Sequence, residues 1–208
     1  KCPDLFEKIE KVLGKYEIKG FMLEQMGDML PPLNFWDKGD YTLDAWQKEV
    51  IGYIKQRESV IVKAPTSAGK TFVAMATGIL HKRILYVCPA KPVAYQVGAN
   101  FQKMGYKVHF LVEGLCDLSY DKQTNIFIGV PKIIEDCLPK MGIQYEYAVF
   151  DEIHIAELFK LLEKDVTTKF RVLLCYDHDS DKTLNAFDKS SFNFKILKIK
   201  NKNKGPHG

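Results

Sequence analysis

The chain has 208 residues and a formal net charge of +4, with 46% hydrophobic and 27% charged residues. This composition supports one sizeable folded domain and excludes an intrinsically disordered chain. No apolar run reaches the ~18 residues of a membrane-spanning helix, and no signal-peptide pattern is present, so we expect no membrane partner. The five cysteines are widely spaced and form no C-x-x-C pair. They predict neither a zinc site nor a disulfide framework, which fits a reducing, intracellular setting such as the cytoplasm.

The first 40 residues match no familiar pattern beyond a helical spacing of apolar residues at 4–13, and we interpret 1–40 as an N-terminal extension. A second amphipathic helix is predicted over 43–56. From there on, short apolar runs alternate with helical stretches. The apolar runs are 59–64, 83–88, 107–112, 125–130, 147–150, 171–176 and 194–199, and the helical stretches are 70–81, 91–104, 131–140 and 153–163.

The apolar runs are rich in Val and Ile and hardly alternate with polar residues, which is typical of strands buried on both faces of a sheet. Their alternation with helices predicts an α/β fold, in which a mostly parallel sheet is flanked by helices. We assign 41–200 to this domain and 201–208 to a flexible basic tail. No acidic residue follows Asp188, so the lysines near the C-terminus form either a solvated edge and tail or a contact with a polyanion.

The segment VIVKAPTSAGKTFVA, residues 60–74, joins a predicted buried strand to a predicted helix through a short loop. The first N–H groups of a helix lack intrahelical partners and the helix dipole favours negative charge there, so this junction predicts an anion site. Gly69 would let a phosphate approach, Lys70 would reach the β- and γ-phosphates, and Thr71 would ligate Mg²⁺. Ala64 replaces the first glycine of the generic phosphate loop. The alternative is an ordinary loop with an exposed lysine.

A second signal is YAVFDEIH, residues 147–154, in which two carboxylates directly follow an apolar strand. Asp151 would then lie at the carboxyl edge of a parallel sheet, where α/β folds bind ligands. In phosphate-loop nucleoside triphosphatases an acidic residue at this place holds Mg²⁺, and Glu152 would orient or deprotonate the attacking water. An acidic pair that complements a helix dipole is the alternative. The coincidence with the phosphate loop favours the nucleotide site.

The motifs Ala-Pro-Thr-Ser-Ala-Gly-Lys-Thr (64–71) and Asp-Glu-Ile-His (151–154) resemble the DExH-box helicases of superfamily 2. The wording is closest to the branch of superkiller-type and antiviral DExH RNA helicases. The resemblance covers about residues 41–180 and implies the first RecA-like lobe of a helicase that uses ATP and Mg²⁺. The implied catalytic residues are Lys70, Asp151, Glu152 and His154, the implied cofactor-binding residues are Gln47, Thr66, Ser67, Ala68, Gly69, Lys70 and Thr71, and the implied metal ligands are Thr71 and Asp151.

Three further segments resemble motifs of the same family. Residues 43–47 resemble its upstream glutamine motif, so that Gln47 would read the adenine edge and Trp46 would pack near it, with plain core packing as the alternative for Trp46. Residues 89–96 and 130–132 are similar to its two strand-binding motifs. They imply contacts with the phosphate backbone of one nucleic-acid strand, with RNA favoured over DNA. The residues implied in these contacts are Ala90, Lys91, Val130, Pro131 and Lys132.

Two departures from the family pattern bear on activity. The family's third motif, Ser-Ala-Thr, couples ATP hydrolysis to strand separation and is replaced here by Cys175-Tyr176-Asp177. A counterpart of the second RecA-like lobe, which carries arginine fingers, does not follow in these 208 residues. We expect that lobe in the same parent chain, and we expect this chain alone to bind ATP weakly and to hydrolyse it poorly. An inactive helicase-derived scaffold and a double-stranded DNA translocase stay open as alternatives.

Overall fold

The computed structural model describes residues 43–65, 68–152, 161, 171–176 and 195–199. The predicted extension, the predicted tail and nearly all of the predicted helix over 153–163 lie outside these ranges. Within them, the other predicted elements are confirmed, with ends that differ by two residues at most. No described helix is long and apolar enough to cross a membrane. The helices are α3 (Ala45–Lys55), α4 (Lys70–Leu80), α5 (Lys91–Lys103) and α6 (Pro131–Met141), and the strands are β1 (Val60–Lys63), β2 (Ile84–Val87), β3 (Val108–Leu111), β4 (Ile126–Gly129), β5 (Tyr147–Asp151), β6 (Arg171–Tyr176) and β7 (Lys195–Lys198).

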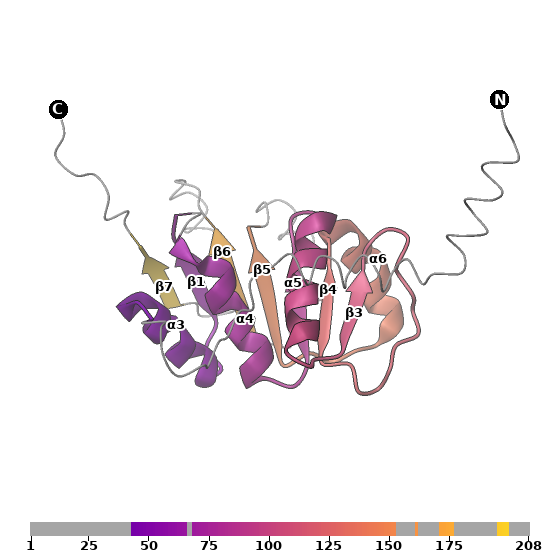
Figure 1. Ribbon diagram of the computed structural model, residues 1–208, viewed down its shortest axis with the longest axis horizontal. Helices are drawn as coiled ribbons and strands as arrows, with labels where there is room; N and C mark the ends of the chain where they lie inside the picture. The colour runs from indigo at the N-terminus through magenta and orange to yellow at the C-terminus, as the bar shows by residue number, and fades with distance from the viewer. Residues whose placement is uncertain (1–42, 66–67, 153–160, 162–170, 177–194, 200–208) are drawn as a thin grey trace, which may run out of the picture.

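The described strands form one sheet in the order β3-β4-β2-β5-β6-β1-β7, and every neighbouring pair is parallel. Figure 1 shows α3, α4 and α5 in front of this sheet. The predicted α/β class is therefore confirmed. Because all strands run in one direction, the loops that follow β1, β2, β4 and β5 meet at the same edge. β6 lies between β1 and β5, so any contact between the ends of these two strands must pass over it.

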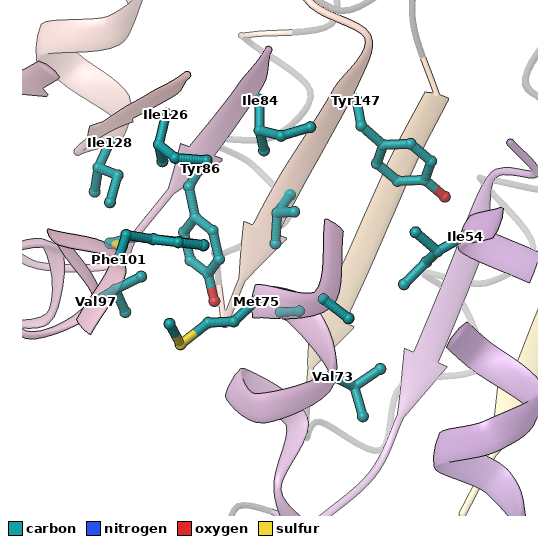
Figure 2. Packing of buried hydrophobic residues seen from close by; sticks show 14 of the residues in the cluster. Ile54, Val73, Met75, Ile84, Tyr86, Val97, Phe101, Ile126, Ile128 and Tyr147 are labelled. Atoms are coloured by element: carbon teal, nitrogen blue, oxygen red, sulfur yellow. The ribbon is translucent and has the colours of Figure 1, made fainter. Parts of the chain in front are cut away.

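Alternate residues of the central strands pack into two different layers. In β5, Tyr147 and Val149 belong to the core cluster shared with α3, α4 and α5, part of which is shown in Figure 2, whereas Ala148 and Phe150 belong to the cluster shared with α6. This period of two explains why the strands are apolar on both faces. It also places Asp151, two residues after Val149, on the side of the sheet that α4 covers.

Gly129 ends β4 at a point where neighbouring residues leave no room for a side chain. A Cβ atom there would lie 2.7 Å from Leu111 Cβ and 2.9 Å from Ile134 Cγ1, and closer still to the Leu111 carbonyl oxygen. We expect Gly129→Ala to lower the free energy of unfolding by about 1–3 kcal/mol through overpacking. Gly52→Ala is the matched control: a Cβ atom there meets nothing within 4 Å, and alanine favours a helix by about 0.5–1 kcal/mol. The free energy of unfolding of both variants is measured in urea. An equal change in the two variants would contradict the close packing at Gly129.

The structure corrects one expectation from the sequence, because it joins Cys116 and Cys137 in a disulfide. Cys116 lies in the loop after β3 and Cys137 lies in α6, 21 residues further along the chain. The pairing of β3 with β4 brings the two segments together, which the spacing of the cysteines could not indicate. Cys88 is a free, buried thiol whose pKa is raised well above its usual value by burial and, to a smaller extent, by the nearby Asp151.

Candidate active site

The loop between β1 and α4 spans residues 64–69 and ends on Gly69, whose backbone is left-handed with φ +81°. A Cβ atom at Gly69 would lie 3.0 Å from Gln47 Nε2, so a side chain there would be strained and would crowd Gln47. The first N–H groups of α4 and the positive end of its dipole face the loop, and no acidic residue in the first turn competes with an anion there. The described end of the loop is therefore suited to an anion. The predicted contacts Thr66 and Ser67 lie outside the described residues.

Lys70 is the first residue of α4, and its side chain is only 2% exposed although it carries a charge. Its Nζ donates a hydrogen bond of 2.8 Å to the Ala64 carbonyl oxygen and lies 3.0 Å from Glu152 Oε1. A buried ammonium requires such partners, because an unpaired buried charge is strongly destabilising. The Glu152 side chain is 41% exposed, so a phosphate that enters from solvent can replace its carboxylate as the partner of Lys70.

Asp151 ends β5 and is buried, with 2% exposure. Its Oδ2 accepts a hydrogen bond of 3.0 Å from the Thr71 hydroxyl and another of 3.0 Å from the Tyr86 hydroxyl. Its Oδ1 is buried and has no hydrogen-bond partner in the described part of the chain. Burial raises the pKa of Asp151, whereas the bonds from Tyr86 and Thr71 lower it. A cation beside Oδ1 would satisfy both the unpartnered oxygen and the buried charge.

The oxygen atoms of Thr71 and Asp151 fit Mg²⁺, which prefers hard oxygen ligands. Among the residues that the structure describes, no three or more His, Cys, Asp or Glu side chains converge to hold a metal. Mg²⁺ does not require such a cage, because proteins commonly bind it through one or two carboxylates together with waters and substrate phosphates. Thr71 and Asp151 could therefore hold Mg²⁺ together with the phosphates of a nucleotide.

Glu152 has a left-handed backbone with φ +53°, which costs a non-glycine residue about 1–2 kcal/mol. This turn comes directly after the buried Asp151 and brings the Glu152 carboxylate to Lys70. Backbone strain of this kind is concentrated at functional sites, where the surrounding structure maintains it. The geometry therefore supports a functional part for Glu152 more strongly than the sequence alone does.

Gln47 lies in the first turn of α3 and reaches the loop, but the protein itself uses both of its amide atoms. Oε1 accepts a hydrogen bond of 3.0 Å from the Asp44 N–H, and Nε2 donates one of 3.5 Å to the Ala68 carbonyl oxygen. A second N–H and a second lone pair of the amide stay available to a ligand, and adenine reading by Gln47 stays a prediction. Trp46 is half-buried against the core cluster that α3, α4 and α5 share, which agrees with the packing interpretation. His154 lies outside the described residues.

The loops after β2 and β4 lie side by side, because these two strands are neighbours in the sheet. At the start of the loops, the Cys88 N–H donates a hydrogen bond of 2.8 Å to the Gly129 carbonyl oxygen. Ala90 is the N-cap of α5 and Val130 is the N-cap of α6. Two helix N-termini therefore face the same edge of the sheet, where their N–H groups favour anions.

Exposed lysines accompany both of these helix N-termini. Lys91 and Lys132 are exposed, whereas Pro131, which opens α6, is buried. Lys91 Nζ donates a hydrogen bond of 2.8 Å to the Glu113 carbonyl oxygen and lies 5.7 Å from the centre of the Tyr95 ring. The structure thus brings the predicted nucleic-acid residues to one edge of the sheet. Their contact with a nucleic acid stays a prediction.

Tyr86 belongs to this site although sequence reasoning did not single it out. It lies within the apolar run of β2, where an aromatic residue is indistinguishable from core packing. Its ring is fully buried, and its hydroxyl donates to Asp151. A phenol hydroxyl within a buried strand needs a hydrogen-bond partner. That requirement was the one signal in the sequence that could have found it.

Comparison with known proteins matches residues 44–173, more than half of the chain, to the family described as DEAD/DEAH box helicase. The antiviral helicase SKI2 of Saccharomyces cerevisiae is 30% identical, over 64% of this chain and 11% of that protein. The probable ATP-dependent RNA helicase DDX60-like of Homo sapiens is 29% identical, over 74% of this chain and 10% of that protein. The chain therefore spans about a tenth of the length of these relatives.

Solved structures share the fold. A hypothetical ATP-dependent RNA helicase from Sulfolobus tokodaii has a TM-score of 0.63 at 18% identity, over 85% of this chain and 56% of that chain. A DEAD box protein from Methanococcus jannaschii has a TM-score of 0.61 at 21% identity, over 74% of this chain and 49% of that chain. The fold is thus that of a RecA-like helicase domain. Together with the family match and the superkiller-type relatives, it shows that the chain belongs to the DEAD/DEAH box helicase family.

Proposed function

We propose that residues 41–200 form the ATP-binding first motor lobe of an ATP-dependent nucleic-acid helicase. A pair of contacts across the sheet edge carries this proposal. Lys70 lies 3.0 Å from Glu152, and Thr71 donates a hydrogen bond of 3.0 Å to Asp151. These contacts join the phosphate loop to the acidic box, Asp151 and Glu152. Asp151 Oδ1 is left buried and without a hydrogen-bond partner in the described structure.

In this proposal the loop binds the triphosphate of ATP. The N-terminus of α4 faces the phosphates, and Thr66, Ser67, Ala68 and Gly69 are the predicted binding loop that precedes it. Lys70 exchanges the Glu152 carboxylate for the β- and γ-phosphates. Gln47, which already lies against the loop, contacts the adenine.

The acidic box would activate the attacking water. Thr71 and Asp151 would hold Mg²⁺, which supplies positive charge at the β- and γ-phosphates when it is bound. Once a phosphate binds Lys70, the Glu152 carboxylate no longer pairs with this lysine and can accept a proton from the attacking water. His154, two residues beyond Glu152, would link this site to a second RecA-like lobe.

The nucleic acid would lie across the loops after β2 and β4. Ala90, Val130 and Pro131 form the two helix starts, and Lys91 and Lys132 add positive charge beside them. Such groups bind phosphates and read no base sequence. We favour RNA over DNA because relatives such as the ATP-dependent RNA helicase mtr4 of Schizosaccharomyces pombe, 31% identical over 55% of this chain and 11% of that protein, are named as RNA helicases.

A direct test is the binding of a fluorescent ATP analogue in the presence of Mg²⁺. We expect weak but measurable binding by this chain. Lys70→Ala should weaken it about 10–100-fold, because a hydrogen bond to a charged group contributes roughly 1.5–3 kcal/mol. Lys122→Ala is the control, since this exposed lysine lies in the loop before β4, at the opposite edge of the sheet. Equal affinity of all three proteins, or no binding by any, would contradict an ATP site at Lys70.

A further inference from the structure

Tyr86 connects β2 to the carboxylate that ends β5. Its hydroxyl donates a hydrogen bond of 3.0 Å to Asp151 Oδ2, and the Thr71 hydroxyl donates another of 3.0 Å to the same oxygen. A carboxylate oxygen has about two lone-pair sites, so these two donors saturate Oδ2. Oδ1, buried and without a partner among the described residues, is the oxygen that remains available.

We propose that Tyr86 is a positioning residue that fixes the rotation of the Asp151 carboxylate, so that Oδ1 faces the Mg²⁺ of bound ATP. This inference rests on the proposed function. Tyr86 itself would touch neither the metal nor the nucleotide. With only the Thr71 hydroxyl on Oδ2, the carboxylate would have one donor and could turn about its side-chain torsion. The Mg²⁺-dependent part of ATP binding would then be weakened.

The surroundings of Tyr86 can hold its hydroxyl in one place. The ring is fully buried and packs edge-to-face on Phe101, with ring centres 6.2 Å apart. Figure 2 shows the two rings beside each other. Phe101 is held in turn by Tyr106, with ring centres 5.9 Å apart. β2 pairs directly with β5, so donor and acceptor lie on neighbouring strands. A donor that is fixed in this way can orient a carboxylate, whereas a mobile one cannot.

Tyr86 also lies three residues before Pro89, in the strand that leads into the first predicted strand-binding loop. Its hydroxyl bonds the proposed metal carboxylate from the strand that leads into that loop.

The test separates metal-dependent from metal-free nucleotide binding. The affinity for a fluorescent ATP analogue is measured in Mg²⁺ and in EDTA for the unaltered chain and for Tyr86→Phe. Mg²⁺ should raise the ATP affinity of the unaltered chain, and we expect this rise to be roughly tenfold smaller in Tyr86→Phe. The affinity measured in EDTA should be the same for both proteins. Tyr147→Phe is the matched control, because this buried phenol of β5 donates to the Glu58 carbonyl oxygen instead. It should keep the full gain.

The outcomes are distinguishable. An unaltered chain that binds no ATP in either buffer overturns the proposed function itself. An unaltered chain with a Mg²⁺-dependent gain that Tyr86→Phe retains overturns the inference about Tyr86 alone. Should Tyr86→Phe fail to fold, 3-fluorotyrosine incorporated at position 86 keeps the phenol. Its ¹⁹F resonance should then shift with Mg²⁺ and ATP but not with ATP in EDTA, and an equal response in both would overturn the inference.

Discussion

Replacement of Glu152 by glutamine should lower the ATPase rate about 10²–10⁴-fold, the usual contribution of a general base, while ATP binding persists. The substitution keeps the shape of the side chain but removes its ability to accept a proton. It also removes the carboxylate that pairs with Lys70 at 3.0 Å. The phosphates then no longer compete with that carboxylate for Lys70. We therefore expect ATP affinity to stay equal or to rise. The measurement is steady-state ATPase activity of the longest natural form, together with binding of a fluorescent ATP analogue.

The same assay should be run with single-stranded RNA, with DNA and with neither polymer. Stimulation by RNA that vanishes in Glu152→Gln would support a motor that acts on RNA, and stimulation by DNA alone would favour a DNA translocase. ATP binding without turnover under any condition would favour the inactive scaffold. Glu146→Gln is the control, because Glu146 lies just before β5, at its other end, and accepts a hydrogen bond of 3.2 Å from the Lys82 N–H. A comparable loss of activity in this variant would contradict a specific part for Glu152.

The sequence could predict the sheet because each strand is a short apolar run between turn residues and helical spacings. It could also predict that the loop after β1 and the carboxylates at the end of β5 lie at one edge of the sheet, where the structure pairs Lys70 with Glu152 and Thr71 with Asp151. That reasoning needs only the parallel direction of the strands. It holds even though β6 separates β1 from β5 in the sheet.

Other features depend on three-dimensional neighbours that no sequence pattern reveals. The Tyr86 hydroxyl finds Asp151 only because β2 and β5 pair in a particular register. The disulfide between Cys116 and Cys137 depends on how the loop after β3 lies against α6. The bond from the Asp44 N–H to Gln47 is a local helix cap, and it occupies an atom that family resemblance assigns to the nucleotide. In each case the residue type permits several partners, and packing selects one.

Addition of a second RecA-like lobe should raise the ATPase rate by about 10³–10⁵-fold over that of this 208-residue chain, the range that an arginine finger provides in phosphoryl transfer. The described site contains one buried cation, Lys70, and in the absence of nucleotide its own carboxylate partner neutralises it. In the proposed function the ends of β1 and β5 would therefore bind the phosphates but would add little protein charge to stabilise the transition state. The part of this chain that matches SKI2 and the DDX60-like protein covers only about a tenth of their length, which leaves ample length in them for a second lobe.

The comparison is between this chain and a natural form that contains both lobes, at saturating Mg²⁺ and ATP and with RNA present. A large difference in turnover at saturating ATP would assign the added catalytic charge to the second lobe, while this chain supplies the nucleotide site and the proposed base Glu152. Glu152→Gln in the two-lobed form should return the rate to roughly that of this chain or below it, because Glu152 and the second lobe would act on the same phosphoryl-transfer step. Robust turnover by this chain alone would contradict the need for a second lobe. It would require all the catalytic groups to lie within these 208 residues.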